Sequence, residues 1–314
     1  MSSPIDPDVS NALTEAGLSP LMVAHVVGRA LAEDLADGPD ITTIATIAAD
    51  QVGQADVVPR EAGVVAGLPV VAFVFAMVGE GRVRVEIDAA DGDIVDIGQV
   101  LLRASGPVRD LLTAERTALN VLTHLSGIAT LTRIWTDAVS GSKAQIRDTR
   151  KTMPGLRALE KYAVRCGGGV NHRMSLSDAA LIKDNHVAAA GSVGAAFALV
   201  RAAAAELDRE LEIEVEVDTP LQCAEAIEAG AQLILLDNMS LADLRICVEL
   251  AAGTGIRLEA SGGLSLGVAA AVAGTGVDYL SVGALTHSAP VLDIGLDLTV
   301  TDLTVTEART VADA

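Results

Sequence analysis

The chain has 314 residues, half of them apolar but only 2% aromatic, which is enough for one large or two ordinary domains with an aliphatic core. It carries 42 Asp and Glu residues against 22 Lys and Arg residues, and the net charge of −20 argues against nucleic acid or an anionic membrane as a partner. Cys166, Cys223 and Cys247 form no CxxC or metal-binding pattern, so we expect free thiols. The sequence shows no pattern of a secretory leader and no long uncharged apolar run, so we expect a cytoplasmic protein.

The first part of the chain predicts a mixed α/β domain. Apolar residues at helical spacing over 21–31 indicate a helix. Between residues 45 and 104, short β-branched runs separated by Gly and Asp predict small antiparallel strands, and a helix is expected over 68–78. Residues 110–135 predict one long helix, or two helices joined near Ser126 and Gly127.

A basic segment follows, from Lys143 to His186. It holds nine Lys and Arg residues against four Asp and Glu residues, although the chain as a whole is strongly acidic. Several of these cations lie in polar turns, and the triple glycine 167–169 interrupts the segment, so a solvent-facing basic helix is the weaker interpretation. The pattern favours an anionic ligand.

From residue 145 onward the pattern becomes a βα repeat. Four apolar segments end in polar or glycine residues at Glu216, Asp237, Ser261 and Gly283, with Ala- and Leu-rich helices expected over 220–229, 241–252 and 264–273. Such a repeat predicts a parallel sheet with covered faces. An α/β barrel with its site at the C-terminal ends of the strands fits best, and a doubly wound sheet is the alternative.

The end of the chain alternates like a strand from Val291 onward and is expected to return to the first domain. We therefore predict an N-terminal α/β sandwich domain over 1–127, completed by 290–314, and an incomplete α/β (TIM-like) barrel over 128–289.

Acidic residues alternate along one predicted strand. In the segment 212–218, Glu212, Glu214, Glu216 and Asp218 fall on one face, which would point into the barrel. Buried carboxylates are unfavourable unless they are paired or bind a metal. Glu216 and Asp237 are placed to meet at the end of adjacent strands, where oxygen ligands suggest Mg²⁺. The alternative is salt bridging to the nearby lysines and arginines.

Two glycine-containing loops are candidates for a phosphate site. Ser261-Gly262-Gly263 and Gly283-Ala284 each follow a predicted strand and precede a helix, where backbone N–H groups can approach phosphate oxygens. His287 lies four residues after Gly283 and could assist, although a lone histidine is more often a surface or capping residue.

The cations divide by chemistry. Arg150 and Arg173 suit bidentate binding of carboxylates, Lys151 and Lys183 act as point charges, and His172 directly precedes Arg173. An acidic small molecule with a phosphorylated co-substrate would use all of them. A phosphosugar aldolase with Lys183 as a Schiff-base lysine would use them too, and residue spacing leaves this possibility open.

Long motifs throughout the chain resemble the quinolinate phosphoribosyltransferase family. They are ALAEDLADGPDITT at 30–43, AERTALNVLTHLSGIAT at 114–130, DTRKT at 148–152, GGGVNHRMSLSDAALIKDNH at 167–186, EVEVD at 214–218, LILLDN at 233–238, SGGL at 261–264 and SVGALTHS at 281–288. The resemblance covers nearly the whole chain in order. The chain departs from the family pattern at Ala260, where serine is usual, at Met153, where leucine is common, and in a longer C-terminal tail.

The resemblance implies a pentosyltransferase of NAD biosynthesis that uses quinolinate, phosphoribosyl pyrophosphate and Mg²⁺. It implies a homodimer in which Arg116 is donated to the partner's active site. It implies catalytic Lys151, Glu216 and Asp237, of which the two acids also contact the metal. The implied substrate-binding residues in the same chain are Thr149, Arg150, His172, Arg173, Lys183, Ser261, Gly262, Gly283 and His287.

Two other activities are compatible with this fold. A paralogue could transfer phosphoribose to a different acceptor, as the member of the family found in molybdenum operons does. The chain could instead be a non-catalytic barrel that senses phosphate compounds, which is a different class of protein. The presence of Lys151, Glu216 and Asp237 argues against that class.

Overall fold

The computed structural model describes residues 7–209 and 211–301, which divide into two compact units. The first unit contains the residues up to 130, residues 158–166 and the residues from 289 onward, and the second contains residues 131–157 and 167–288. The sequence boundaries had placed 158–166 in the barrel. In the structure this segment lies in the first unit, where the Tyr162 hydroxyl donates a hydrogen bond to Asp91.

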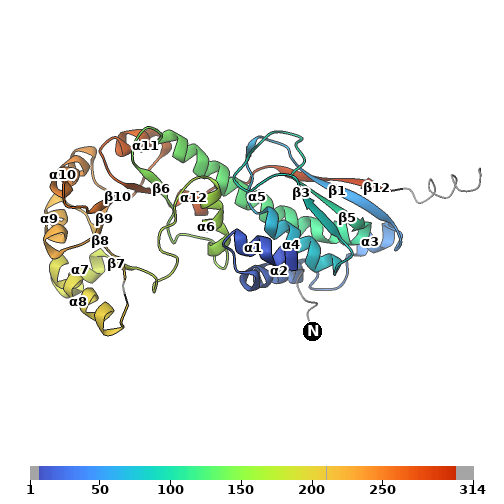
Figure 1. Ribbon diagram of the computed structural model, residues 1–314, viewed down its shortest axis with the longest axis horizontal. Helices are drawn as coiled ribbons and strands as arrows, with labels where there is room; N and C mark the ends of the chain where they lie inside the picture. Colours follow the sequence, from blue (N-terminus) through green and yellow to red (C-terminus); the bar gives the residue numbers. More distant parts are fainter. Residues whose placement is uncertain (1–6, 210, 302–314) are drawn as a thin grey trace, which may run out of the picture. The chain divides into compact units, whose positions relative to one another are not determined.

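The first unit contains a four-stranded antiparallel sheet in the order β12-β1-β5-β3 (Figure 1). Its strands are β1 (Val52–Pro59), β3 (Arg84–Ile87), β5 (Leu102–Pro107) and β12 (Ile294–Val300), and a separate pair is formed by β2 (Gly63–Val64) and β4 (Ile94–Val95). Ala55 pairs with both Ala104 and Leu298, so the strand expected near the C-terminus does return to the first sheet. The predicted extension of this domain over 302–314 lies outside the described residues.

Helices complete the first unit. They are α1 (Pro7–Glu15), α2 (Pro20–Asp34), α3 (Ile41–Thr46), α4 (Leu68–Gly79), the first part of α5 (Val108–Ala138) and nearly all of α6 (Arg157–Cys166). Nearly every side chain of α4 is apolar and most are buried, and α4 packs against β3 and β5. At the start of α4, the amides of the N-cap residue Gly67 and of Leu68 donate to the carboxylate of Asp91, which supplies acceptors for amides that have no partner within the helix.

The long helix expected around 110–135 is one continuous helix of 31 residues. Gly127 lies inside it without a break. A Cβ atom at Gly127 would lie 2.0 Å from the backbone oxygen of Pro290, so this glycine allows the returning chain to cross the helix at close range.

The second unit is an incomplete TIM-like barrel. Six parallel strands pair in the order β6-β11-β10-β9-β8-β7. They are β6 (Gln145–Arg147), β7 (Ala180–Ile182), β8 (Ile213–Val217), β9 (Leu233–Asp237), β10 (Arg257–Ser261) and β11 (Tyr279–Ser281). An isolated parallel bridge between Arg147 and Val170 extends the sheet beside β6, and no strand pairing among the described residues joins that end to β7.

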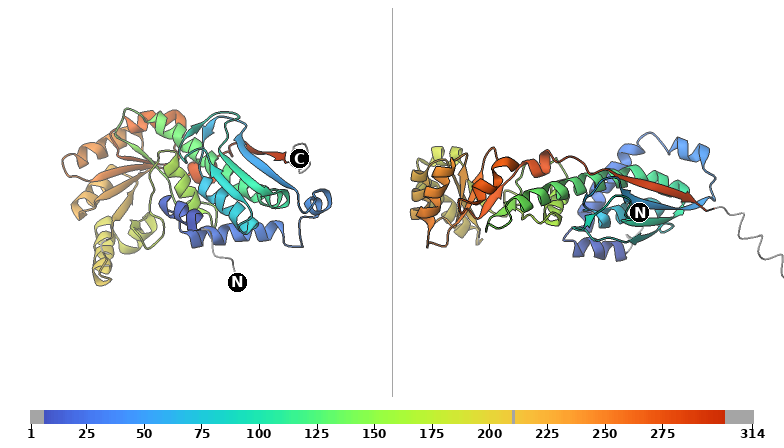
Figure 2. Two further views of the ribbon diagram at one scale, coloured as in Figure 1. Left: turned by 45° about the vertical axis from the view of Figure 1, so that its right-hand side comes forward. Right: turned by 90° about the horizontal axis from the view of Figure 1, so that it is seen from above.

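Helices lie on the outer side of this sheet (Figures 1 and 2). They are α7 (Asp184–Ala190), α8 (Val193–Glu206), α9 (Pro220–Ala229), α10 (Leu241–Ala251) and α11 (Leu266–Ala273), with the short α12 (Ala284–His287) after β11. Because the helices cover one side, the doubly wound alternative is wrong. The apolar residues Ile213, Val215 and Val217 of β8 are buried, and α8 and α9 contact this strand.

Two sequence expectations about the whole chain can be compared with the structure. All three cysteines are free; Cys223 and Cys247 are buried, whereas Cys166 is partly exposed. Among the described residues, no single helix has the length and apolar composition of a membrane span, although the sharply bent pair α7–α8 passes that test when taken together.

Candidate active site

The predicted site residues other than Arg116 all lie in the second unit, at or just after the C-terminal ends of its strands. Because the strands are parallel, these ends share one edge of the sheet. Thr149, Arg150 and Lys151 follow β6, Lys183 follows β7, Glu216 is in β8, and Asp237 and Ser261 end β9 and β10. His172 and Arg173 follow the bridge at Val170, and Gly283 and His287 follow β11.

Lys183 and Glu216 form an ion pair across adjacent strands, with 2.5 Å between Lys183 Nζ and Glu216 Oε2. Among the alternating acids in and beside β8, two fit the salt-bridge alternative: Glu212 pairs with Arg257 and Glu216 pairs with Lys183. Glu214 instead contacts the His172 ring, with 2.9 Å between Oε2 and Nε2. Asp218, the last of the series, is exposed. Because the Lys183 nitrogen is already engaged by a carboxylate, this contact does not support a Schiff-base role for Lys183.

The ends of β9 and β10 are locked together through backbone geometry. Asp237 pairs in register with Ser261, and the Asn238 amide donates to the Ser261 carbonyl at 2.9 Å. Asn238 has a positive φ of 51°, and its side-chain amide donates to Asp237 Oδ2. A Cβ atom at Gly262 would lie 2.2 Å from Asn238 Oδ1, and φ at Gly262 is 92°. Only glycine fits this turn without rearrangement.

Lys151, Gly283 and His287 lie together. A Cβ atom at Gly283 would lie 3.1 Å from both Lys151 Cδ and His287 Nε2. Backbone bonds hold the lysine, because its amide donates to Thr149 Oγ1 and its carbonyl accepts a hydrogen bond from the Thr286 hydroxyl. A lysine, a small residue and a helix N-terminus thus meet in one place, as an oxyanion ligand requires.

Arg150 and Arg173 both keep a buried Nε atom with no hydrogen-bond partner among the described residues. Arg173 donates through Nη1 to the Ala179 carbonyl at 3.0 Å. Burial lowers the pKa of Arg173, and the positive charge of Arg150 lowers it further. Two neighbouring guanidinium groups with unused donors are unfavourable unless an anion joins them.

A buried polar layer lies inside the barrel, below this edge. Glu259 accepts hydrogen bonds from Arg147 and from the Ser281 hydroxyl. His172 Nε2 lies 2.9 Å from Glu214 Oε2 and 3.6 Å from Glu259 Oε1. Burial raises the pKa of Glu214 to about 7, against the opposing effect of the Arg147 charge. Burial also raises the pKa of Glu259, and the neighbouring Glu214 adds to that shift.

The ligand atoms of His172, Glu214 and Glu259 are close enough together to suggest a metal site. The hydrogen bonds argue against that. The Arg173 amide donates to His172 Nδ1 at 2.7 Å, so a neutral ring carries its proton on Nε2. The nitrogen that faces the two carboxylates then has no lone pair for a cation.

Glu216 and Asp237 offer a more suitable donor set. Each uses one carboxylate oxygen in a hydrogen bond or ion pair, and the other oxygen, Oε1 or Oδ1, has no hydrogen-bond partner among the described residues. Carboxylate oxygens are the protein ligands that Mg²⁺ prefers.

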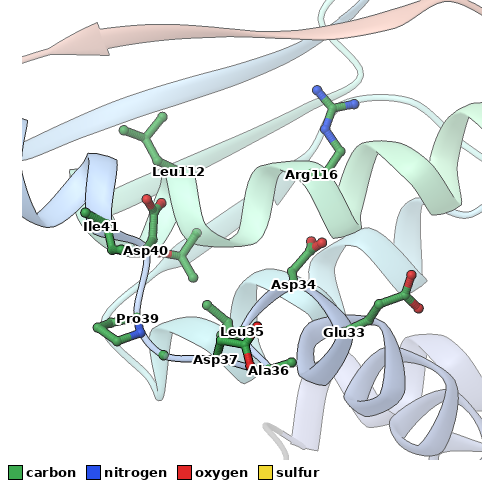
Figure 3. A pocket seen from close by; sticks show the side chains of 12 residues that line it. Glu33, Asp34, Leu35, Ala36, Asp37, Pro39, Asp40, Ile41, Leu112 and Arg116 are labelled. Carbon is green, nitrogen blue, oxygen red and sulfur yellow. The ribbon is translucent and has the colours of Figure 1, made fainter.

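Arg116 lies in the first unit, on α5, beside a cavity of about 460 Å³ (Figure 3). The cavity is lined largely by the end of α2 and the loop to α3, including Glu33, Asp34, Asp37 and Asp40. Figure 3 shows the Arg116 guanidinium directed away from the carboxylates of Asp34 and Glu33. Among the described residues, Arg116 forms no hydrogen bond and no ion pair, although the residues around it are acidic.

Comparison with known proteins identifies the family. Residues 40–126 match the N-terminal domain of quinolinate phosphoribosyl transferase, and residues 128–297 match its C-terminal domain. The chain belongs to the quinolinate phosphoribosyltransferase family.

Relatives in this family match over nearly their whole length. The nicotinate-nucleotide pyrophosphorylase [carboxylating] of Mycobacterium leprae is 56% identical over 87% of this chain and 95% of the relative. A probable enzyme of the same name from Bacillus subtilis is 41% identical over 91% and 97% of the two chains. The crystal structure of NadC from Streptococcus pyogenes is 42% identical, with a TM-score of 0.85 over 91% of this chain and 99% of that one.

Some residues that shape this site were not among the predicted site residues. Glu214 was recognised only as one member of an alternating series, and Glu259 and Asp148 were given no role. Asp148 is fully buried and accepts hydrogen bonds from the His172 amide and the Asn171 side chain. The available signals were the acids at alternate positions in EVEV and the acid in LEAS. Strand alternation places such carboxylates inside the barrel, but it does not show which residue each one pairs with.

Proposed function

We propose that this chain transfers the phosphoribosyl group of phosphoribosyl pyrophosphate to quinolinate, and that it releases pyrophosphate and CO₂ to give nicotinate mononucleotide. The observation that carries the proposal is the pair of buried, unpartnered Nε atoms on Arg150 and Arg173, at the same edge as Lys151, Glu216 and Asp237. The names of the relatives support the same reaction.

The two arginines would bind the dicarboxylate. A carboxylate accepts paired hydrogen bonds from a guanidinium group, and a bound dianion would offset the mutual repulsion of Arg150 and Arg173. Fixing both carboxylates orients the pyridine ring so that its nitrogen faces C1′ of the phosphoribosyl group.

The loops after β6, β10 and β11 would bind the second substrate. Gly262 and Gly283 leave room for phosphate oxygens to approach the backbone, with Ser261 and His287 beside them. Lys151 lies next to Gly283 and would stabilise the negative charge that develops on the departing pyrophosphate. Glu216, held by Lys183, would lie near the ribose as its ring gains positive charge.

Mg²⁺ would be held by the remaining oxygens of Glu216 and Asp237, directly or through water. It would supply charge neutralisation for the pyrophosphate.

Bond changes balance without a covalent enzyme intermediate. The pyridine nitrogen bonds to C1′ as the bond from C1′ to the pyrophosphate oxygen breaks. The positively charged ring then accepts the electron pair left when the 2-carboxylate departs as CO₂, and C2 takes up a proton. The chain's residues bind, orient and supply charge throughout.

We further propose that the enzyme acts as a homodimer and that Arg116 enters the partner's site. Arg116 has no anionic partner among the described residues of its own unit, although acidic side chains line the cavity beside it. An arginine that has no anionic partner in its own unit is suited to bind an anionic ligand held in the site of another subunit.

Incubation with quinolinate, phosphoribosyl pyrophosphate and Mg²⁺ tests the reaction. We expect equimolar CO₂ and nicotinate mononucleotide. Pyrophosphate release with another acceptor but not with quinolinate would instead assign a paralogous transferase. Borohydride trapping of a substrate on Lys183 would assign aldolase-like chemistry, and we expect no adduct.

A further inference from the structure

Glu214 is a buried carboxylate of this site whose contacts do not account for its burial in terms of folding stability. Its side chain is 3% exposed, one oxygen accepts from His172, and the other oxygen has no hydrogen-bond partner among the described residues. A buried carboxylate in this state is unfavourable for folding, so its retention calls for another reason.

The His172 ring connects Glu214 to Arg173. Its side chain is 7% exposed, and both of its nitrogens contact protein groups: Nε2 contacts Glu214 and Nδ1 accepts the Arg173 amide. An imidazole that donates from Nε2 must accept at Nδ1 when it is neutral. The carboxylate therefore selects the tautomer that the Arg173 backbone requires.

Arg173 is held at both ends by this arrangement. Its amide is fixed by His172 Nδ1, and its guanidinium is fixed by the Ala179 carbonyl, which leaves the buried Nε free. If the ring changed tautomer, an N–H group at Nδ1 would face the Arg173 amide, and the two donors would repel each other. The start of the arginine side chain would then move.

We propose that Glu214 is a positioning residue, which holds His172 in the Nε2–H tautomer so that Arg173 is presented to the dicarboxylate substrate. In this role His172 acts through Arg173. The inference rests on the proposed function for the identity of the ligand.

The first test compares three substitutions inside the barrel. Glu214→Gln keeps an oxygen that can accept from Nε2, whereas Glu214→Met keeps the length of the side chain without an acceptor. The matched control is Glu212→Met, two residues earlier and just before β8, where the lost partner is Arg257 rather than His172.

We expect Glu214→Met to raise the KM for quinolinate about tenfold or more, because it removes the acceptor of the His172 Nε2–H group and with it the constraint on the tautomer of the ring. The KM for phosphoribosyl pyrophosphate and kcat should each change less than about threefold, because the lost contact acts on the dicarboxylate alone. Glu214→Gln and Glu212→Met should keep the quinolinate KM within about threefold of the unaltered chain. Equal quinolinate KM values in all three variants would overturn the proposal.

A second measurement does not depend on turnover. Nitrogen NMR of the ¹⁵N-labelled full chain distinguishes a ring nitrogen that carries hydrogen from one that does not. His172→Gln identifies the His172 signals among the five histidines. We expect hydrogen on Nε2 alone, and loss of this single-tautomer signature in Glu214→Met. Hydrogen on Nδ1 in the unaltered chain would refute the proposal.

The two failures remain distinguishable. Absence of CO₂ release from quinolinate by the unaltered chain would remove the proposed function, whereas the NMR result would still decide the tautomer. Normal turnover with a tautomer that does not respond to Glu214 would remove only the positioning role.

Discussion

At the scale of single residues, the site is built from charges that the fold brings close but does not neutralise. Arg150 and Arg173 repel each other and retain unused donors, and Glu214 retains an unused acceptor. Such groups lower the stability of the folded chain and raise its affinity for a complementary ligand. The pattern is that of a preorganised anion site, in which the arginine side chains lose their water when the chain folds and not when the ligand binds.

Replacing Arg173 with lysine separates charge from geometry. Arg173→Lys keeps one positive charge but loses the planar fork and the buried Nε donor, so the quinolinate KM should rise about tenfold to a hundredfold. The KM for phosphoribosyl pyrophosphate should change little. The control is Arg257→Lys at the start of β10, an arginine that pairs with Glu212, which should leave the quinolinate KM unchanged. Initial-rate kinetics would check this, and similar effects from both variants would contradict a specific carboxylate contact.

At the scale of elements, glycines mark the points where backbones approach closely. Gly262 allows the turns after β9 and β10 to meet, and Gly127 allows the chain at Pro290 to cross α5. Neither requirement follows from the local pattern. Gly127 sits in a helical sequence where alanine would ordinarily be preferred by about 1 kcal/mol.

Two glycine-to-alanine substitutions in helices should therefore change the free energy of unfolding in opposite directions. Gly28→Ala in α2 adds a Cβ atom with no heavy atom within 4 Å and should stabilise the chain by about 0.5–1 kcal/mol. Gly127→Ala places its Cβ 2.0 Å from the Pro290 oxygen and should destabilise it by about 1–3 kcal/mol. Urea unfolding of the two variants measures both. A stabilising Gly127→Ala would show that this crossing relaxes at no cost.

At the scale of the whole molecule, charge is distributed unevenly. The chain has a net charge of −20, yet its cations are concentrated in the segment from Lys143 to His186 that supplies half of the predicted site. A negative protein with a positive site repels unrelated anions over most of its surface and attracts them at one place. This distribution suits two highly charged small substrates better than a polymeric partner.

The proposed homodimer with a shared site makes a prediction about mixtures of inactive chains. Arg116→Ala and Lys151→Ala should each abolish turnover, because one removes the residue donated to the partner and the other removes a residue of the barrel site. Unfolding and remixing the two variants should restore up to about a quarter of the normal activity, since a mixed dimer has one intact site. Assays of each variant alone provide the baseline. No recovery in the mixture would show that Arg116 serves the site of its own chain.

The architecture could be predicted from the sequence, and so could the edge of the sheet at which the polar residues gather. Alternation in β8 and the βα repeat are local patterns, so the parallel strands and the polar residues at their ends could be recognised from chain order alone. The folded chain was needed to show which groups pair: Glu214 with His172, Glu259 with Arg147, and β12 with β1. These contacts join residues far apart in the chain, and their energies depend on burial and distance, which no local pattern contains. The tautomer of His172 is decided in the same way, because it depends on a carboxylate from one strand and an amide from a loop that meet only when the barrel is folded.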